Sequence, residues 1–215
     1  MYRPPAFRED RLEVLHAFIR AHPLAMLVTA GEGGLVANPI PFLIDPDGAE
    51  KGLLRAHLAK ANGQLAALRA GGEAMVLFQG PDAYVTPSWY ATKREHGKVV
   101  PTWNYATVHA WGTPRVIDDE SWLRGQIGDL TDAQEQHRSH PWAVEDAPAD
   151  FVASQIKGIA GLEIPIARIE GKWKVSQNRA ASDRQGVVDG LRQQTADGGA
   201  MADLVEECGD LGKGG

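Results

Sequence analysis

The sequence predicts an α+β fold built on a small β-barrel. Short apolar segments bounded by Gly and Pro recur in the first half of the chain, as is typical of antiparallel strands. Segments with helical spacing of apolar residues separate them. The 215 residues suit one domain, and 43% hydrophobic with 23% charged residues are ordinary globular values. We expect one domain over residues 1–192 and a flexible, acidic, Gly-rich tail over residues 193–215.

The charge and cysteine content exclude several classes of protein. The 22 basic and 28 acidic residues give a net charge of −6, which does not suit a protein that coats nucleic acid. The single cysteine, Cys208, excludes an internal disulfide framework. No apolar run reaches about 18 residues, as a membrane span would need. The start of the chain lacks the apolar stretch of a signal peptide, so we expect a cytoplasmic protein.

The first elements are a helix and a hairpin. A helix begins near Asp10, and Pro23 ends it. The apolar run 24–30 is predicted to be a buried strand, and its partner follows over 35–45 after a Gly-rich turn. Two prolines, Pro39 and Pro41, place this second strand at a sheet edge or in a bulge, because Pro cannot donate to a ladder.

The remaining elements follow from periodicity and from Gly and Pro. We expect strands at 53–58, 74–79 and 83–86, a helix at 62–68, an ordered loop at 88–99, and a long β segment at 102–117 with a break at 112–114. The last third predicts a helix capped by Asp118, a helix at 151–156, a hairpin of 162–169 with 172–175, and a helix at 183–191.

A polar cluster lies where one strand ends and a helix begins. His57, Lys60 and Asn62 place donors next to the free N–H groups of a helix start, which suits a phosphate. A solvated strand end explains the same residues equally well. Gln79 ends the next apolar strand, where an amide can bond to the edge of a ring such as a flavin or a base. A turn residue that bonds to its own backbone is the alternative.

Two further segments combine aromatic, amide and basic side chains. Trp103 and Asn104 lie in an aromatic stretch that suits a planar ligand, a dimer interface or a core. Gln177 and Arg179 lie in a basic stretch that leaves a strand and enters a helix. The planar fork of Arg179 suits a phosphate or a carboxylate, and a simple helix start is the alternative.

The histidines do not predict a metal site. His137 and His140 stand three residues apart, but Pro141 ends that segment and no third ligand has suitable spacing. Serine nucleophile elbows, phosphate-binding P-loops and dinucleotide-binding fingerprints are absent. No catalytic residue is therefore assigned.

Taken together, the motifs resemble those of the PaiB family, which is described as FMN-binding negative transcriptional regulators. The resemblance covers about residues 1–192 and departs from the family pattern at Pro39, Ala56 and Gly63. The segments that carry it are Met1-Tyr2 with Phe7, Phe78-Gln79-Gly80-Pro81, Ser88-Trp89-Tyr90, Val100-Pro101-Thr102-Trp103-Asn104-Tyr105, Pro141-Trp142 and Ser176-Gln177-Asn178-Arg179.

The resemblance implies a split β-barrel like that of pyridoxamine phosphate oxidase, a homodimer, and FMN in a groove between subunits. It places the FMN phosphate near the strand-to-helix turn at 57–62 and the isoalloxazine edge near Gln79. The cofactor-binding residues expected on this basis are His57, Lys60, Asn62, Gln79, Trp103, Asn104, Gln177 and Arg179.

The implied function is that of an FMN-binding regulator of transcription. The net charge does not support direct DNA binding, which would need a local cluster such as Lys93, Arg94 and Lys98, or Lys172, Lys174 and Arg179. We therefore expect repression to act through a partner. One alternative is a flavin-dependent oxidoreductase, since the flavin itself carries redox chemistry. Another is a haem-binding split barrel, with His96, His109 or His137 as the axial ligand.

Overall fold

The computed structural model describes residues 1–31, 33–194 and 198–210. By its packing, the chain divides into two compact units. Unit 1 contains Met1–Asp10, Gln79–Val108 and the described residues from Glu170 onward, and unit 2 contains Arg11–Phe78 and His109–Ile169. Each unit therefore combines stretches that are far apart in the sequence.

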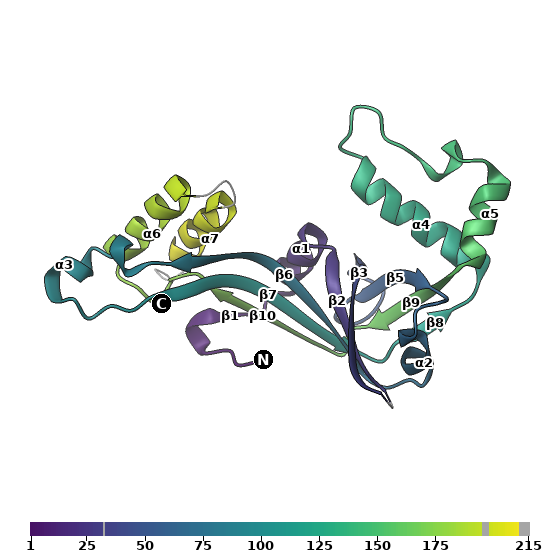
Figure 1. Ribbon diagram of the computed structural model, residues 1–215, viewed down its shortest axis with the longest axis horizontal. Helices are drawn as coiled ribbons and strands as arrows, with labels where there is room; N and C mark the ends of the chain where they lie inside the picture. Colours follow the sequence, from purple (N-terminus) through teal and green to yellow (C-terminus); the bar gives the residue numbers. More distant parts are fainter. Residues whose placement is uncertain (32, 195–197, 211–215) are drawn as a thin grey trace. The chain divides into compact units, whose positions relative to one another are not determined.

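The strands form two sheets, of six and four strands, with the orders β1-β10-β7-β6-β2-β3 and β4-β5-β9-β8 (Figure 1). Where registers are defined, the pairs are antiparallel. This confirms the predicted α+β class, but the described strands form two open sheets rather than one closed barrel. The strands are β1 Arg8–Glu9, β2 Leu24–Gly31, β3 Gly34–Pro41, β4 Leu43–Asp45, β5 Leu53–Ala59, β6 Ala74–Val85, β7 Thr102–Gly112, β8 Arg115–Ile117, β9 Ile159–Pro165 and β10 Arg168–Lys174.

The helices confirm most of the predicted helical segments. The cap of α4 is Asp119, one residue later than predicted, and its carboxylate accepts a bond from the Trp122 N–H. The helices are α1 Leu12–Ala21, α2 Gln64–Arg69, α3 Thr92–His96, α4 Glu120–Glu135, α5 Ala149–Lys157, α6 Ala181–Gln194 and α7 Gly198–Asp210. Short 3-10 turns cover Pro5–Phe7, Pro87–Trp89 and Val144–Asp146.

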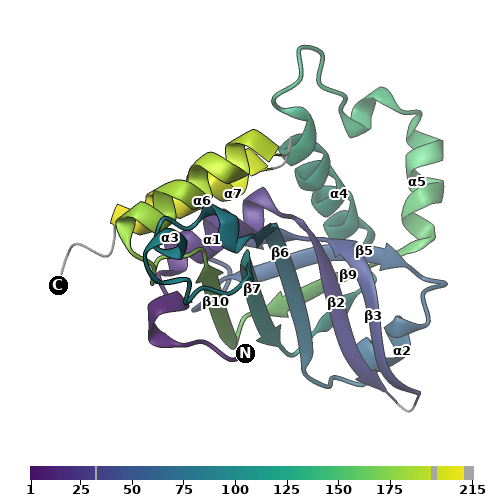
Figure 2. The same cartoon turned by 60° about the vertical axis from the view of Figure 1, so that its left-hand side comes forward.

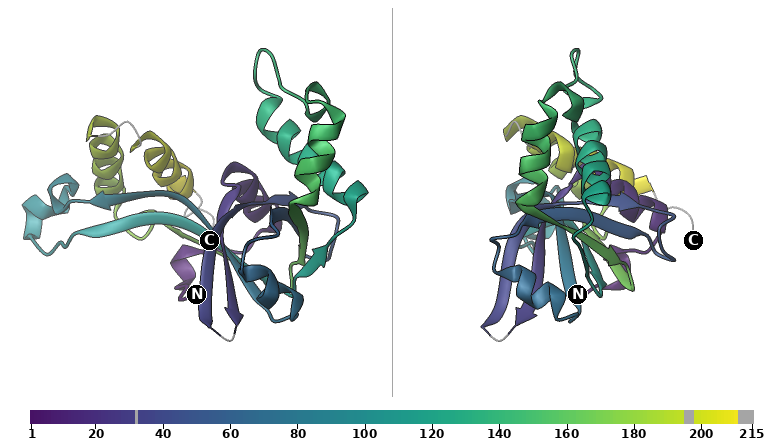
Figure 3. Two further views of the ribbon diagram at one scale, coloured as in Figure 1. Left: turned by 45° about the vertical axis from the view of Figure 1, so that its right-hand side comes forward. Right: turned by 90° about the vertical axis from the view of Figure 1, so that its right-hand side faces the viewer.

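The core of unit 2 lies along β5 and β9. Leu54, Ala56 and Leu58 alternate along β5 and are buried, and the buried Leu162 and Ile164 lie opposite them on β9. Helices α4 and α5 lie beside each other and pack on β9 (Figure 3). Their contact buries a smaller cluster made of Leu123, Val144, Val152 and Ile156.

The core of unit 1 includes helices α6 and α7, which lie side by side (Figure 2). Val187 and Leu191 of α6 are buried, as are Met201 and Val205 of α7. Arg192 forms ion pairs with Asp203 at 3.0 Å and Glu206 at 2.8 Å. Within the tail expected at 193–215, residues 198–210 thus form a packed helix, whereas 195–197 and 211–215 lie outside the described residues.

The structure corrects some of the predicted strands and confirms one predicted break. The strand expected at 35–45 is split into β3 and β4, which lie in different sheets, and the buried Phe42 between them donates its N–H to Pro23 O. The segment 102–117 is likewise divided between two sheets at its predicted break. The strands expected at 74–79 and 83–86 form one strand, β6, and the loop 88–99 contains α3.

The hairpin expected around Glu170 and Gly171 does not form, because both residues lie inside β10. Gly171 pairs with Glu9 of β1, and β9 pairs with β5 and β8 instead. The strand β2 is also not fully buried, since exposed and buried residues alternate along most of it. The prolines of β3 do lie on an edge strand, as predicted.

Helix α6 approaches the turn at Pro87–Trp89 so closely that a methyl group added at Gly186 should destabilise the protein. A Cβ at Gly186 would clash with the backbone carbonyl oxygen of Trp89. We expect Gly186→Ala to lower the free energy of unfolding by about 1–3 kcal/mol, as overpacking does. Gly125→Ala in α4 is the matched control, because nothing lies within 4 Å of its Cβ position. It should stabilise the protein by about 0.5–1 kcal/mol. Urea unfolding of both variants measures this, and equal midpoints would contradict the packing.

Candidate functional site

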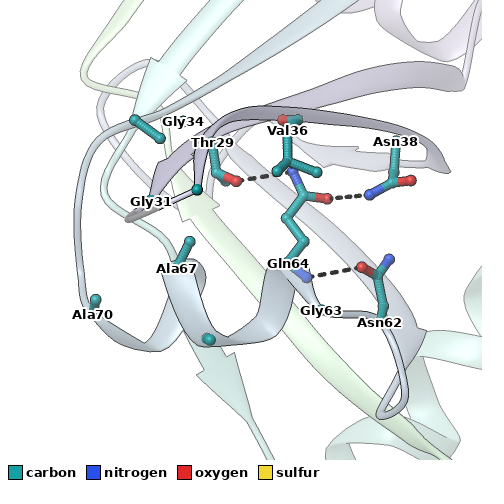
Figure 4. Close-up of a pocket in the computed structure, with 13 residues that line it drawn as sticks. Thr29, Gly31, Gly34, Val36, Asn38, Asn62, Gly63, Gln64, Ala67 and Ala70 are labelled. Carbon is teal, nitrogen blue, oxygen red and sulfur yellow. Dashed lines mark hydrogen bonds between the residues drawn. The ribbon is translucent and has the colours of Figure 1, made fainter.

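A pocket of about 800 Å³ lies in unit 2, between the β2–β3 hairpin and helix α2 (Figure 4). Small side chains form most of its wall, so the backbone there is accessible to a ligand. The lining residues are Thr29, Ala30, Gly31, Gly33, Gly34, Val36, Asn38, Asn62, Gly63, Gln64, Ala66, Ala67 and Ala70.

Hydrogen bonds of the buried Gln64 amide hold the helix and the hairpin together on the two sides of this pocket. Its Nε2 lies 2.9 Å from Leu27 O, 3.1 Å from Thr29 Oγ1 and 3.3 Å from Val36 O, all of which can accept from it. Its Oε1 accepts a bond from Asn38 Nδ2 at 3.0 Å. One side chain thus ties the start of α2 to both strands of the hairpin (Figure 4).

The start of α2 is set by Asn62. Its Oδ1 accepts the backbone N–H of Gln64 at 3.0 Å, which satisfies one free donor of the first turn. The other side-chain atoms, Asn62 Nδ2 and Asn38 Oδ1, have no hydrogen-bond partner within the described part of the chain. The pocket therefore offers one amide donor and one amide acceptor to a ligand.

Among the residues that the structure describes, none that lines the pocket carries a charged side chain. Arg69, at the end of α2, is paired with Asp118 at 2.9 Å. Lys60 is exposed in the turn before Asn62, and no acidic partner faces it among the residues that the structure describes. Lys60 thus places an exposed positive charge two residues before Asn62, which lines the pocket.

His57 does not share the pocket with Asn62. Its Nδ1 lies 2.6 Å from Oε1 of Gln126 on α4, and the neighbouring Arg55 pairs with Asp129 of the same helix at 2.8 Å. Gln126 is buried, and its Nε2 has no partner within the described residues. Of the three residues predicted at the strand-to-helix turn, only Asn62 lines the pocket.

The other five predicted residues lie in unit 1. Gln79 is exposed on β6, and Trp103 is exposed on β7 with its ring edge-on to Tyr84. Asn104 is buried and exchanges bonds with the Ser176 hydroxyl at 3.0 and 3.2 Å. Gln177 accepts the Val175 N–H at 2.8 Å and donates to Trp173 O. The amide groups of Asn104 and Gln177 are therefore engaged in holding unit 1 together.

Arg179 covers the ring of the buried Tyr90, with its Cζ 4.8 Å from the ring centroid. Burial raises the pKa of Tyr90, and the nearby Arg179 guanidinium opposes this shift. The Tyr90 hydroxyl has no hydrogen-bond partner among the described residues. Arg179 thus has a structural contact in addition to any role in ligand binding.

Asn38 and Gln64, which shape the pocket, were not predicted from the sequence. The signal for Gln64 was present, since it follows Asn62-Gly63 at the expected start of a helix. Nothing in the sequence indicated that its amide enters the hairpin, because this needs the register of β2 with β3.

The described residues hold no cluster of metal ligands and no membrane-spanning helix. No group of three or more His, Cys, Asp or Glu side chains there could hold a metal ion. The Nδ1 of His96 accepts from the Lys98 N–H, His109 packs against Trp111, and His137 lines a separate pocket near α1 and α4. No helix among these residues is long and apolar enough to cross a membrane.

Comparison with known proteins identifies relatives along the whole chain. Residues 1–168 match the model of the family described as "Putative FMN-binding domain". An uncharacterised protein of Emericella nidulans is 37% identical over 98% of both chains. "Protease synthase and sporulation protein PAI 2" of Bacillus subtilis is 29% identical over 96% of this chain and 97% of its own.

Solved structures show a similar fold. The "FAD and Heme binding protein" of Mycobacterium smegmatis superposes with a TM-score of 0.58 at 22% identity, covering 78% of this chain and 73% of that one. The flavocytochrome Anf3 of Azotobacter vinelandii also gives a TM-score of 0.58, at 18% identity, covering 80% of this chain and 72% of that one. These likenesses place the chain among proteins with the split-barrel architecture.

The amide of Gln64 predicts a large loss of stability when it is removed. Gln64→Met keeps the length of the side chain but leaves Asn38 and the hairpin acceptors without their partner. We expect a loss of about 2–3 kcal/mol in the free energy of unfolding. The exposed Gln155 on α5 serves as the control, and Gln155→Met should stay within about 0.5 kcal/mol of the parent. Chemical denaturation measures the free energy of unfolding of both variants. Similar values would show that the hydrogen bonds of the Gln64 amide contribute little to stability.

Proposed function

Because the chain belongs to the "Putative FMN-binding domain" family, in agreement with its resemblance to PaiB, we propose that it binds FMN. The observation that carries the proposal is the family match over residues 1–168, which includes every residue that lines the unit 2 pocket. We propose this pocket as the place where unit 2 holds the cofactor.

The pocket fits such a ligand in size and in chemistry. Its volume of about 800 Å³ lies within the roughly 300–1,000 Å³ of small-molecule sites. The wall of Gly and Ala allows close approach of a planar ring, and the free amide atoms of Asn38 and Asn62 suit its polar edge or a sugar chain. The phosphate is assigned to the turn at 60–63, where Lys60 supplies a positive charge. Bound FMN would supply redox chemistry to the site.

For the other residues expected to bind the cofactor, contact with FMN stays a prediction. His57 is bonded to Gln126, so its ring must leave that partner before it can contact a phosphate. Gln79 and Trp103 are exposed and available to a ligand. Asn104, Gln177 and Arg179 have structural contacts of their own in unit 1.

A role in transcriptional regulation is proposed from the family resemblance alone, and it is proposed to be indirect. The net charge of −6 opposes association with DNA. Lys172, one of the basic residues considered for DNA contact, is only 7% exposed and is poorly placed to reach a backbone phosphate. We therefore assign ligand binding to this chain and leave DNA contact to a partner.

Titration with FMN, followed by visible absorbance, tests the proposal. We expect the purified chain to take up FMN. Ala66→Glu should weaken binding at least tenfold, because a carboxylate in the lining repels the phosphate and is poorly screened in a pocket. Ala66→Gln, of the same size but neutral, should have a smaller effect.

The matched control is Ala133→Glu on α4, which lines a different pocket of unit 2. It should leave FMN binding unchanged. A stronger effect of Ala133→Glu than of Ala66→Glu would move the site to that second pocket. No uptake by the parent chain at any concentration would refute FMN binding altogether.

We also propose a homodimer that forms through one face of the β2–β3 hairpin. Directly opposite pairs on this face are Leu24 with Pro41, Met26 with Pro39, Val28 with Ala37 and Ala30 with Leu35. All of these side chains are apolar, and Leu24 and Leu35 are 65% and 79% exposed. Outward positions of an antiparallel sheet in a monomer usually carry polar residues, so this apolar face requires a cover.

A second copy fits this face better than another partner does. Because the face is uncharged, two copies meet across a two-fold axis without repulsion between like charges. The prolines of β3 oppose addition of a strand at the edge, which leaves the face as the contact. The two strands have eight residues each, so this face measures about 26 Å by 10 Å, an area of about 260 Å². In a stable dimer each partner usually buries roughly 800 Å². The face therefore suits the apolar centre of a larger interface.

A charge in the middle of the face should separate the copies. We expect Met26→Glu to convert a dimer into a monomer in light scattering coupled to size exclusion. Val100→Glu, at an exposed apolar residue of unit 1, is the control and should remain dimeric. A monomeric parent chain, or a dimeric Met26→Glu variant, would contradict this interface.

A further inference from the structure

A second pocket of unit 2, the α1–α4 pocket, lies between the end of helix α1, strand β4 and the end of helix α4. Three stretches that are far apart in the sequence form its wall, at 17–23, 42–44 and 133–137. Its volume of about 540 Å³ is within the roughly 300–1,000 Å³ of sites that hold small molecules. It shares no lining residue with the pocket beside α2, so the two pockets are separate sites.

One side of the α1–α4 pocket is apolar. Leu43 and Ile44 of β4 line it together with Phe42, the residue before the strand. Pro23 adds to this wall just after the end of α1, and its carbonyl oxygen accepts the Phe42 N–H at 2.8 Å. That bond holds the two apolar segments next to each other. The wall therefore suits the hydrocarbon part of a ligand.

The α1–α4 pocket also carries two basic side chains. Arg20 lies in the last turn of α1, and His137 follows the end of α4 by two residues. Neither side chain has a hydrogen bond or an ion pair within the described part of the chain. Glu135 is engaged elsewhere, since it pairs with Arg138 at 2.9 Å and accepts the Trp142 N–H at 3.2 Å. The guanidinium group of Arg20 is therefore available to an anion from solution.

The ends of the two helices favour an anion with a single charge. Arg20 and Ala21 lie in the last turn of α1, and Ala133 and Gln134 lie in that of α4. Free carbonyl groups give a helix C-terminus about half a negative charge, which repels a phosphate dianion. The backbone N–H groups that bind phosphate gather at helix N-termini instead. A carboxylate carries one charge, and its two oxygens match the planar fork of a guanidinium group.

From these observations we propose that the α1–α4 pocket binds a small monocarboxylate with an apolar body. The carboxylate accepts hydrogen bonds from the Arg20 guanidinium, and the ring N–H of His137 is a second donor. The apolar body lies against Pro23 and Leu43. The proposal does not rest on FMN binding, because none of these residues lines the pocket assigned to the cofactor.

Calorimetric titration of the full chain with octanoate, octanamide and acetate tests the proposal. Octanamide lacks the charge, and acetate lacks the apolar body. We expect octanoate to bind with a Kd of roughly 1 mM or tighter, and the other two compounds to bind at least about tenfold more weakly. Arg20→Met should remove the preference for octanoate over octanamide. Arg124→Met, at an exposed arginine of α4 that does not line the pocket, is the matched control and should bind octanoate like the parent.

A carboxylate introduced into the wall of the pocket gives a second test. Ala17→Glu should weaken octanoate binding at least about tenfold, because the new carboxylate pairs with Arg20 three residues on and repels the ligand. Ala17→Gln, of the same size but neutral, should have a smaller effect. Thermal unfolding checks that each variant folds. Octanoate should raise the unfolding midpoint of the parent and not that of Arg20→Met.

Three results would overturn the proposal directly. These are no octanoate binding by the parent at millimolar concentration, equal octanoate binding by the parent and Arg20→Met, and equal binding of octanoate and octanamide by the parent. Excess FMN should not displace octanoate. Loss of octanoate binding in Ala66→Glu but not in Ala17→Glu would place the ligand in the pocket beside α2 and would also contradict the proposal.

Discussion

The buried carboxamide of Gln64 is the interaction on which the unit 2 pocket depends. It joins a short helix to a hairpin whose other face is apolar, and it does so through acceptors on both strands. Because α2 spans only Gln64–Arg69, it cannot be stable by itself, and its attachment must come from outside the helix. The Gln64 amide supplies this attachment and at the same time leaves the small side chains of Ala66 and Ala67 facing the pocket.

Unit 1 uses a comparable arrangement around a different buried amide. Asn104 of β7 bonds to Ser176, and Ser176 has a φ of 64°, a conformation that non-glycine residues rarely adopt. The bonds between Asn104 and Ser176 hold this turn where the chain leaves β10 for α6. In both units, a buried amide side chain joins two segments of the fold.

Elements that depend on local sequence signals, such as the positions of Pro and Gly, could be predicted from the sequence. The helix that Pro23 ends, the edge position of Pro39 and Pro41, and the break at 112–114 follow from backbone chemistry and were predicted. Sheet membership was not predictable, because Phe42 turns the chain from one sheet to the other through a bond to Pro23 O, and that bond requires the tertiary fold. The same contrast between local signals and tertiary contacts holds for the candidate ligand residues. Asn62 was identified from its place before a helix, whereas the partner of His57 lies 69 residues away on α4.

The interleaving of the two units also bears on the order in which the protein folds. Unit 2 is complete once Ile169 has been synthesised, but unit 1 needs the chain beyond Glu170. The pairing of Arg8 with Lys172 then closes a long loop, from residue 8 to residue 172. Closing such a loop costs chain entropy before any contact repays it, and contacts of this range slow folding. During synthesis, the Met1–Asp10 segment must therefore wait, unpaired, until β10 has left the ribosome, and unit 1 forms last.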